Sequence, residues 1–187
     1  QGFPLTDVDC TSCHDAHASN SPNLAYEEVH APYGENECSA CHGTGTALIK
    51  SERELCFGCH AGIAEEMKLG VLHAPLESEQ SCSVCHSPHT SKRQPLLAST
   101  QERVCATCHP ENVQLLETSS SIHPEQDGKA CTACHNPHNS EKGGAELDLV
   151  TESCLNCHSY REHTDHPMGA GVLDPRTSDV LMCSSCH

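Results

Sequence analysis

Every cysteine of this chain lies in a Cys-x-x-Cys-His string. The 187 residues include 16 cysteines, which form eight such strings with none left over. On one helical turn, residues i, i+3 and i+4 share a face. Two thiols can therefore reach the two vinyl groups of a porphyrin while the histidine reaches its iron. The pattern predicts eight covalently attached haems c.

The predicted attachment residues follow directly from the eight strings. The thioether cysteines are Cys10, Cys13, Cys38, Cys41, Cys56, Cys59, Cys82, Cys85, Cys105, Cys108, Cys131, Cys134, Cys154, Cys157, Cys183 and Cys186. The proximal iron ligands are His14, His42, His60, His86, His109, His135, His158 and His187. Zinc knuckles and disulfide frameworks also use paired cysteines, but neither needs a histidine directly after each pair.

The remaining histidines equal the irons in number. Eight of the 16 histidines are proximal ligands, which leaves one spare imidazole for each iron. These predicted distal ligands are His17, His30, His73, His89, His123, His138, His163 and His166. A sixth ligand closes the metal to substrates, so the match predicts bis-histidine haems that pass electrons and do no chemistry on small molecules.

The composition leaves little material for a conventional core. There are about 23 residues for each haem, no Trp, and only two Phe and three Tyr, so the apolar interior must be porphyrin. We therefore expect mostly irregular coil with short α-helices organised around a haem array, and little or no β-structure. Ser51 to Glu54 has the form of a capping box, Thr100 and Thr151 are expected N-caps, and residues 61–69 and 111–118 are expected to be helical.

The motifs repeat as two-haem units. Cys82 and Cys131 are 49 positions apart, as are His89 and His138. Each unit has an opener histidine, a first motif, a second histidine three residues after the first proximal ligand, and a second motif. We expect one continuous domain over 1–187, with a leading haem at 1–29, two-haem units at 30–72, 73–122 and 123–165, and a truncated one-haem unit at 166–187. The first unit departs from the pattern, because His42 is followed by Gly-Thr-Gly.

These motifs resemble the doubled CXXCH motif family of multihaem cytochromes. The resemblance is carried by CHSPH at 85–89 and CHNPH at 134–138, each followed by a leucine-containing segment and a second motif, VCATCH or SCLNCH. It implies electron transport, with haems in alternating stacked and angled pairs. Family members of this kind serve as periplasmic carriers, porin-cytochrome conduits and extracellular filaments, and the motifs do not decide among the three.

His17, His89 and His138 each lie three residues after a proximal ligand, a position we call the +3 histidine. Residues i and i+3 share a helical face, so such a side chain cannot reach the far side of the porphyrin bound by its own motif. Each +3 histidine is therefore expected to ligate a different haem, which would hold neighbouring haems together.

Composition also bears on location and partners. The sequence shows neither a leader segment nor an 18-residue apolar run, so we expect a secreted protein, extracellular or on the cell surface, with the periplasm as the alternative, and no direct membrane span. A formal net charge of −16 argues against nucleic acid and anionic lipid as partners. Other redox proteins or cytochromes are the expected partners.

Three classes of function fit these residues: an electron wire, a multihaem reductase, and an electron store with no path through it. The uniform motifs and scarce polypeptide favour the wire over the enzyme. Within the first class we expect a filament of copies joined head to tail, with a conduit component as the alternative. Because the first unit is one histidine short and His163 is one in excess, His163 is the best candidate for ligating a haem of the next copy, with His17 or His30 if the donation runs the other way.

The full use of cysteine predicts a stoichiometry. The intact mass of the mature protein should exceed the polypeptide mass by eight haems, and no thiol should react with an alkylating reagent, because all 16 would be thioethers. Mass spectrometry before and after alkylation measures both quantities. A smaller mass increment, or any alkylated cysteine, would contradict the prediction.

Overall fold

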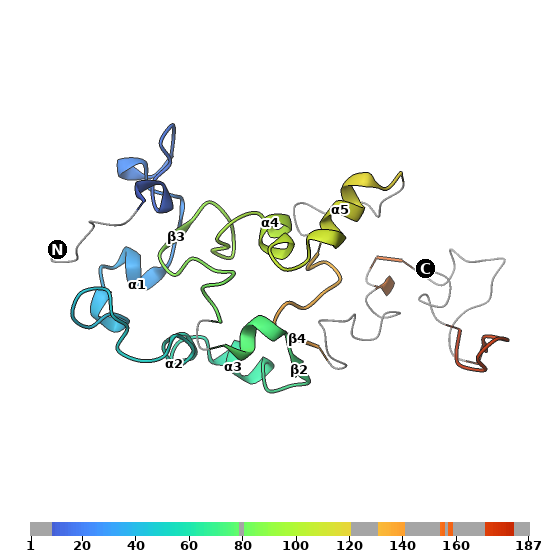
Figure 1. Cartoon of the computed structure of the whole chain (residues 1–187). Coiled ribbons are helices and arrows are strands. Elements are labelled where there is room, and N and C mark those ends of the chain that lie inside the picture. The colour runs from blue at the N-terminus through green and yellow to red at the C-terminus, as the bar shows by residue number, and fades with distance from the viewer. Residues whose placement is uncertain are drawn as a thin grey trace. The chain divides into compact units, whose positions relative to one another are not determined.

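The chain is mostly irregular coil with short helices and small antiparallel strand pairs (Figure 1). The computed structural model describes residues 9–78, 81–120, 131–140, 154–155, 157–158 and 171–181. The chain divides into two compact units, one formed by residues 1–65 and 74–131 and the other by 66–73 and 132–187. This architecture confirms the fold class expected from the composition.

Helices in the described residues are short. The α-helices are α1 (Ala31–Gly34), α2 (Glu52–Phe57), α3 (Ala61–Glu66), α4 (Gln101–Ala106) and α5 (Pro110–Thr118). The 3-10 helices are η1 (Cys10–Ser12), η2 (Pro22–Leu24), η3 (Cys38–Ala40) and η4 (Ala74–Glu77). Helices of this length are marginal in water on their own, so their stability must come from caps and from what they are attached to.

The predicted caps are present. Ser51 and Glu54 form a reciprocal capping box at the start of α2, and the Thr100 side chain accepts from the Arg103 N–H at the start of α4. The α5 helix matches the expected 111–118 segment, extended by Pro110, which favours the first helical position. Helix α3 ends at Glu66, earlier than expected, and Gly70 at φ 72° follows it. The Thr151 cap lies outside the described residues.

The described strands have only two residues each. β1 (Glu28–Val29) pairs antiparallel with β3 (Thr90–Ser91), and β2 (Val71–Leu72) pairs antiparallel with β4 (Asn139–Ser140). The registers are equivalent, because the residue before an opener histidine faces the residue after a +3 histidine in both: Val29 faces Thr90, and Leu72 faces Asn139. The strands therefore repeat with the sequence units.

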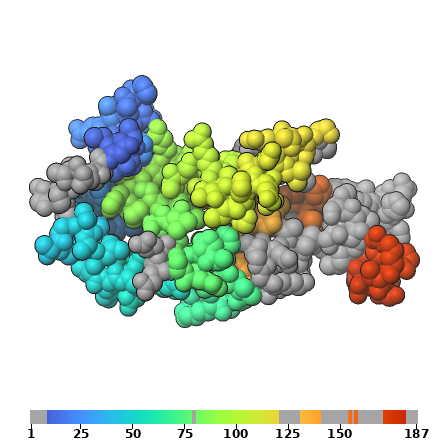
Figure 2. All heavy atoms as spheres, viewed as in Figure 1, coloured from blue at the N-terminus to red at the C-terminus, as the bar shows by residue number. Residues whose placement is uncertain are grey.

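Few side chains in the described residues are buried. The single buried apolar side chain there is Leu76, whereas the four residues of β3 and β4 are all buried. Large apolar side chains are exposed instead, among them Leu115 at 63% on α5, the yellow helix at the surface in Figure 2. Within the described part, no helix has the length and apolar content needed to cross a membrane. Exposed apolar residues and a missing side-chain core fit an interior supplied by a cofactor.

The capping box predicts a local stability effect. Ser51→Ala removes the acceptor for the Glu54 N–H, which should cost about 1 kcal/mol and speed hydrogen exchange of the α2 amides roughly fivefold. Ser51→Thr keeps a hydroxyl acceptor and serves as the control. Exchange measured by NMR on the haem-loaded protein checks the effect, and equal rates in the two variants would contradict it.

Candidate haem-attachment sites

Six of the Cys-x-x-Cys-His strings in the described residues form single helical turns. The histidine N–H donates to the carbonyl of the first cysteine in His14, His42, His60, His86, His109 and His158, at 2.8 to 3.0 Å. First motifs lie on 3-10 turns such as η1 and η3, whereas the second motifs at Cys56 and Cys105 continue α2 and α4. Both forms place the two thiols and the imidazole on one face, as haem attachment requires.

The proximal histidines of the leading haem and of two first motifs each place Nδ1 beside a backbone carbonyl. Nδ1 lies 2.9 Å from the Asn23 carbonyl in His14, 3.0 Å from the Thr46 carbonyl in His42, and 2.9 Å from the Pro95 carbonyl in His86. A carbonyl only accepts, so Nδ1 carries the proton and the lone pair of the neutral ring lies on Nε2. Carbonyl contacts of this kind fix the ring orientation and tautomer of metal-binding histidines. Each of these rings is therefore set to offer Nε2 to iron.

The opener histidines make a contact that we call the histidine clasp. The N–H of His30 donates to the carbonyl of His89 at 2.9 Å, and its Nδ1 lies 2.9 Å from the Pro88 carbonyl. The equivalent distances from His73 are 3.3 Å to the His138 carbonyl and 3.2 Å to the Pro137 carbonyl. The clasp thus joins an opener histidine of one repeat unit to the +3 histidine of the next.

Two imidazole pairs lie close together in the first compact unit. The ring centres of His30 and His60 are 6.1 Å apart with an interplanar angle of 15°, and those of His42 and His89 are 5.9 Å apart at 40°. Tyr33 packs against His89 at 5.0 Å. Burial lowers the pKa of His89, with smaller effects from His42 and His30. The lowered pKa favours the neutral imidazole, which is the form that binds a metal.

Two pairs of consecutive motifs adjoin one another through their cysteines. The Cys56 thiol contacts that of Cys82; burial and this neighbour raise the pKa of Cys56 to about 12. Burial and Cys105 likewise raise the pKa of Cys131 to about 11. Each contact joins the second motif of one unit to the first motif of the next, so these attachment points follow sequence order.

One polar side chain at the start of α2 and one at the start of α4 reinforce these two contacts between motifs, which we call the joints. Glu52 Oε1 accepts from the N–H groups of Cys82 at 2.6 Å and Ser83 at 2.7 Å, while Glu52 Oε2 accepts from the Ser83 hydroxyl at 2.7 Å. Gln101 Oε1 accepts from the Cys131 N–H at 2.8 Å in the equivalent place. Both residues begin their helices four positions before a second-motif cysteine. Sequence reasoning missed them, although this shared position was a usable signal.

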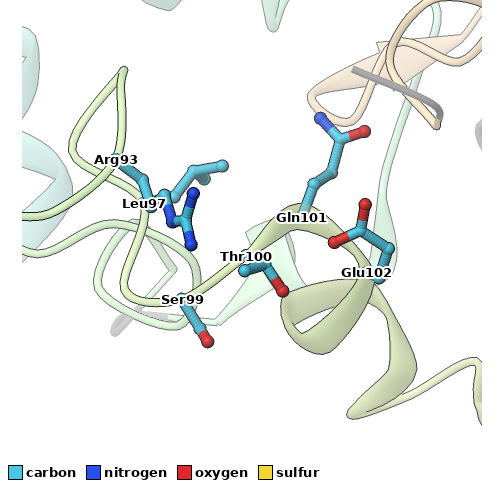
Figure 3. A pocket seen from close by; sticks show the side chains of 6 residues that line it. All are labelled: Arg93, Leu97, Ser99, Thr100, Gln101 and Glu102. Carbon is cyan, nitrogen blue, oxygen red and sulfur yellow. The ribbon is translucent and has the colours of Figure 1, made fainter. Parts of the chain in front are cut away.

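A hollow of about 210 Å³ borders the second of these joints. As Figure 3 shows, it runs from the loop beside β3 to the start of α4. Its lining residues are Arg93, Leu97, Ser99, Thr100, Gln101 and Glu102. Leu97 bridges to His86, and Gln101 bonds Cys131, so the hollow lies between segments that serve two predicted attachment motifs.

Several predicted site residues lie outside the described part of the chain. They are His123, His163, His166, Cys183, Cys186 and His187. Of the +3 histidines, His89 and His138 are held in clasps, whereas the His17 side chain is 97% exposed and lies 4.0 Å from Asp15.

Helical CXXCH turns, oriented imidazoles and the scarcity of buried apolar side chains among the described residues together define a multihaem c-type cytochrome. When bound, haem supplies an iron centre that takes up and releases one electron. The chain's own residues would hold it by thioethers, orient each proximal ring through a backbone carbonyl, and keep successive motifs adjacent. This arrangement is that of an electron-transfer protein.

Comparison with known proteins agrees. The doubled CXXCH motif model matches residues 3–29, 30–65, 73–114 and 123–163, which make up most of the sequence, so the chain belongs to the doubled CXXCH motif family. It is also 29% identical over 87 residues to the multiheme cytochrome MtrA of Shewanella baltica (strain OS185). That match covers 44% of this chain and 25% of the relative, so the chain spans about a quarter of the relative's length.

The joint at Glu52 yields a prediction. Glu52→Ala leaves the N–H groups of Cys82 and Ser83 without their acceptor and should lower the free energy of unfolding by about 1–2 kcal/mol. Glu52→Gln should retain most of the stability, because an amide oxygen already fills this role at Gln101. Denaturant unfolding of the haem-loaded protein measures both variants. Equal losses in Ala and Gln would show that the charge, not the acceptor, matters.

Proposed function

We propose that this protein is an eight-haem electron wire that assembles head to tail into an extracellular filament. All eight haems would be bis-histidine ligated, and electrons would pass between motifs in sequence order. The thiol contacts between consecutive units and the Glu52 and Gln101 joints support that order. Haems held at adjacent attachment points can exchange electrons without any moving carrier.

The proposal of self-association rests on residues 18 and 19, which pair with no strand in the part of the chain that the structure describes; we call this segment the open edge. Locally this segment matches β3: Ser19 donates to the Ala25 carbonyl and accepts from the Ser21 N–H, as Ser91 donates to the Leu97 carbonyl and accepts from the Arg93 N–H. Thr90 and Ser91, which pair with β1, are 2% and 4% exposed. In contrast, Ala18 is exposed and Ser19 half-exposed.

The occupant we propose for this edge is an opener segment of a second copy other than β1 and β2, which are already paired within the chain. Within the chain, a +3 histidine segment pairs in both described cases with the two residues before an opener histidine. Unpaired strand edges recruit further strands, and a contact between different surfaces of two copies repeats along an open fibre. Head-to-tail pairing would thus extend the clasp from one molecule to the next.

The same geometry bears on the histidine that crosses between copies. His30 is engaged with His89 inside the chain, whereas His17 sits at the open edge. His17 is therefore favoured over His30, and His163, which lies outside the described residues, stays a prediction. A bond of this kind would couple assembly to haem ligation.

Location and partners follow from the same proposal. We infer a secreted protein outside the cell, with the periplasm as the alternative, that receives electrons from other redox proteins. The charge of −16 would favour basic partners or cations between copies. A component of a membrane conduit is the second candidate, favoured by the family and by the similarity to a multiheme cytochrome over part of the chain.

Electron microscopy of the purified haem-loaded protein, with one edge variant, tests this function. Ala18→Arg places a charge where the equivalent Thr90 and Asn139 are 2% and 6% exposed, so it should abolish filaments. Ala16→Arg is the matched control, because the equivalent Pro88 and Pro137 stay exposed in both clasps. Both variants should keep their haem content.

Two results would contradict the filament proposal. One is an absence of polymers in the wild-type protein, which would favour the conduit component or a soluble carrier. The other is unchanged polymerisation of Ala18→Arg, which would exclude strand pairing at Ala18 as the contact between copies.

A further inference from the structure

The two imidazole pairs of the first compact unit have the spacing of axial ligands. A metal–imidazole bond is about 2.0 Å long, so two imidazoles on opposite sides of one iron have ligating nitrogens about 4 Å apart and ring centres about 6 Å apart. The observed ring-centre distances are 6.1 Å for His30 and His60 and 5.9 Å for His42 and His89. Each ring-centre distance thus matches that of two imidazoles bound to one iron.

The ring orientations agree with this spacing. Nδ1 of His30 faces the Pro88 carbonyl, and Nδ1 of His42 faces the Thr46 carbonyl. Both rings therefore carry their proton on Nδ1 and present the Nε2 lone pair to a metal. His60 and His42 are themselves the predicted proximal ligands of the second and first motifs of the unit at 30–72. Each pair thus joins one proximal histidine with one spare histidine.

The clasp explains how the two spare histidines reach these positions. His30 opens its unit, whereas His89 belongs to the next unit, 59 positions later in the sequence. Pairing of β1 with β3 brings them together, and the His30 N–H donates to the His89 carbonyl at 2.9 Å. The ring centre of Tyr33 lies 5.0 Å from that of His89. Both rings are therefore positioned by backbone contacts and packing.

We propose that His30 is the distal ligand of the haem carried by Cys56, Cys59 and His60, and that His89 is the distal ligand of the haem carried by Cys38, Cys41 and His42. The first haem draws its ligand from its own unit and the second from the next unit. The proposal rests on haem attachment at these two motifs and is independent of self-association.

This assignment changes the meaning of the Gly-Thr-Gly sequence after His42. If a +3 histidine serves the first motif of the preceding unit, the missing one at position 45 does not deprive the haem of its own motif. It deprives the haem at Cys10, Cys13 and His14 instead. That haem would take its sixth ligand from a histidine other than the missing one.

Spin-state counting on the haem-loaded full chain tests the assignment. His30→Ala and His89→Ala keep the backbone clasp but remove one imidazole, so each should convert one iron from low-spin to high-spin by electron paramagnetic resonance. The control Val29→Ala, in β1 directly before His30, should convert none. The haem content of every variant is checked by intact mass.

Deleting one haem identifies which iron each histidine serves. With Cys56→Ser and Cys59→Ser, His30→Ala should add no high-spin iron; with Cys38→Ser and Cys41→Ser it should add one. His89→Ala should give the opposite result in both backgrounds. An added high-spin iron where none is expected, or no change in either single variant, would overturn the assignment.

A second measurement covers the case in which the haem-deletion variants do not mature. A high-resolution structure of the wild-type haem-loaded protein shows directly which imidazoles lie opposite His60 and His42. The proposal expects His30 and His89, and any other residue in either position would overturn it.

Discussion

The histidine clasp is the contact on which the rest of the described architecture depends. A short, coil-rich repeat unit cannot bury enough apolar surface to fold by itself. In the part of the chain that the structure describes, two clasps make one repeat unit depend on the next, because the N–H of an opener histidine donates to a carbonyl of the following repeat unit. In the two-residue strand pairs beside the clasp, the residues of β3 and β4 are buried. One repeated hydrogen-bond pattern thus both orders the backbone and positions spare imidazoles.

The remaining contacts hold the predicted haem-attachment points in order. Thiol contacts and the Glu52 and Gln101 acceptors join the end of one unit to the start of the next. Apolar side chains such as Leu115 stay exposed instead of forming a core. Polypeptide contacts therefore set the positions of the attachment points, and the covalent cofactor would supply the apolar interior and the electron chemistry.

Local features of this fold could be predicted from the sequence, and pairwise features could not. The capping box at Ser51 and the cap at Thr100 depend on neighbouring residues, so their sequence signatures were sufficient. A two-residue strand has no periodic pattern, and its partner lies more than 60 positions away. The openers and the +3 histidines were both visible as repeats, but their pairing was not. The distal assignments depend on that pairing and could not be derived from composition or spacing.

Amide hydrogen exchange of the haem-loaded protein tests the central claim most directly. If the clasp orders the units, the His30 and His73 amides, which donate to the carbonyls of His89 and His138, should exchange only through large-scale opening of the fold. Exposed coil amides such as that of Ala16 should exchange far faster. Exchange of His30 and His73 at the rate of exposed coil would contradict the account, because the units would then be ordered by something other than this contact.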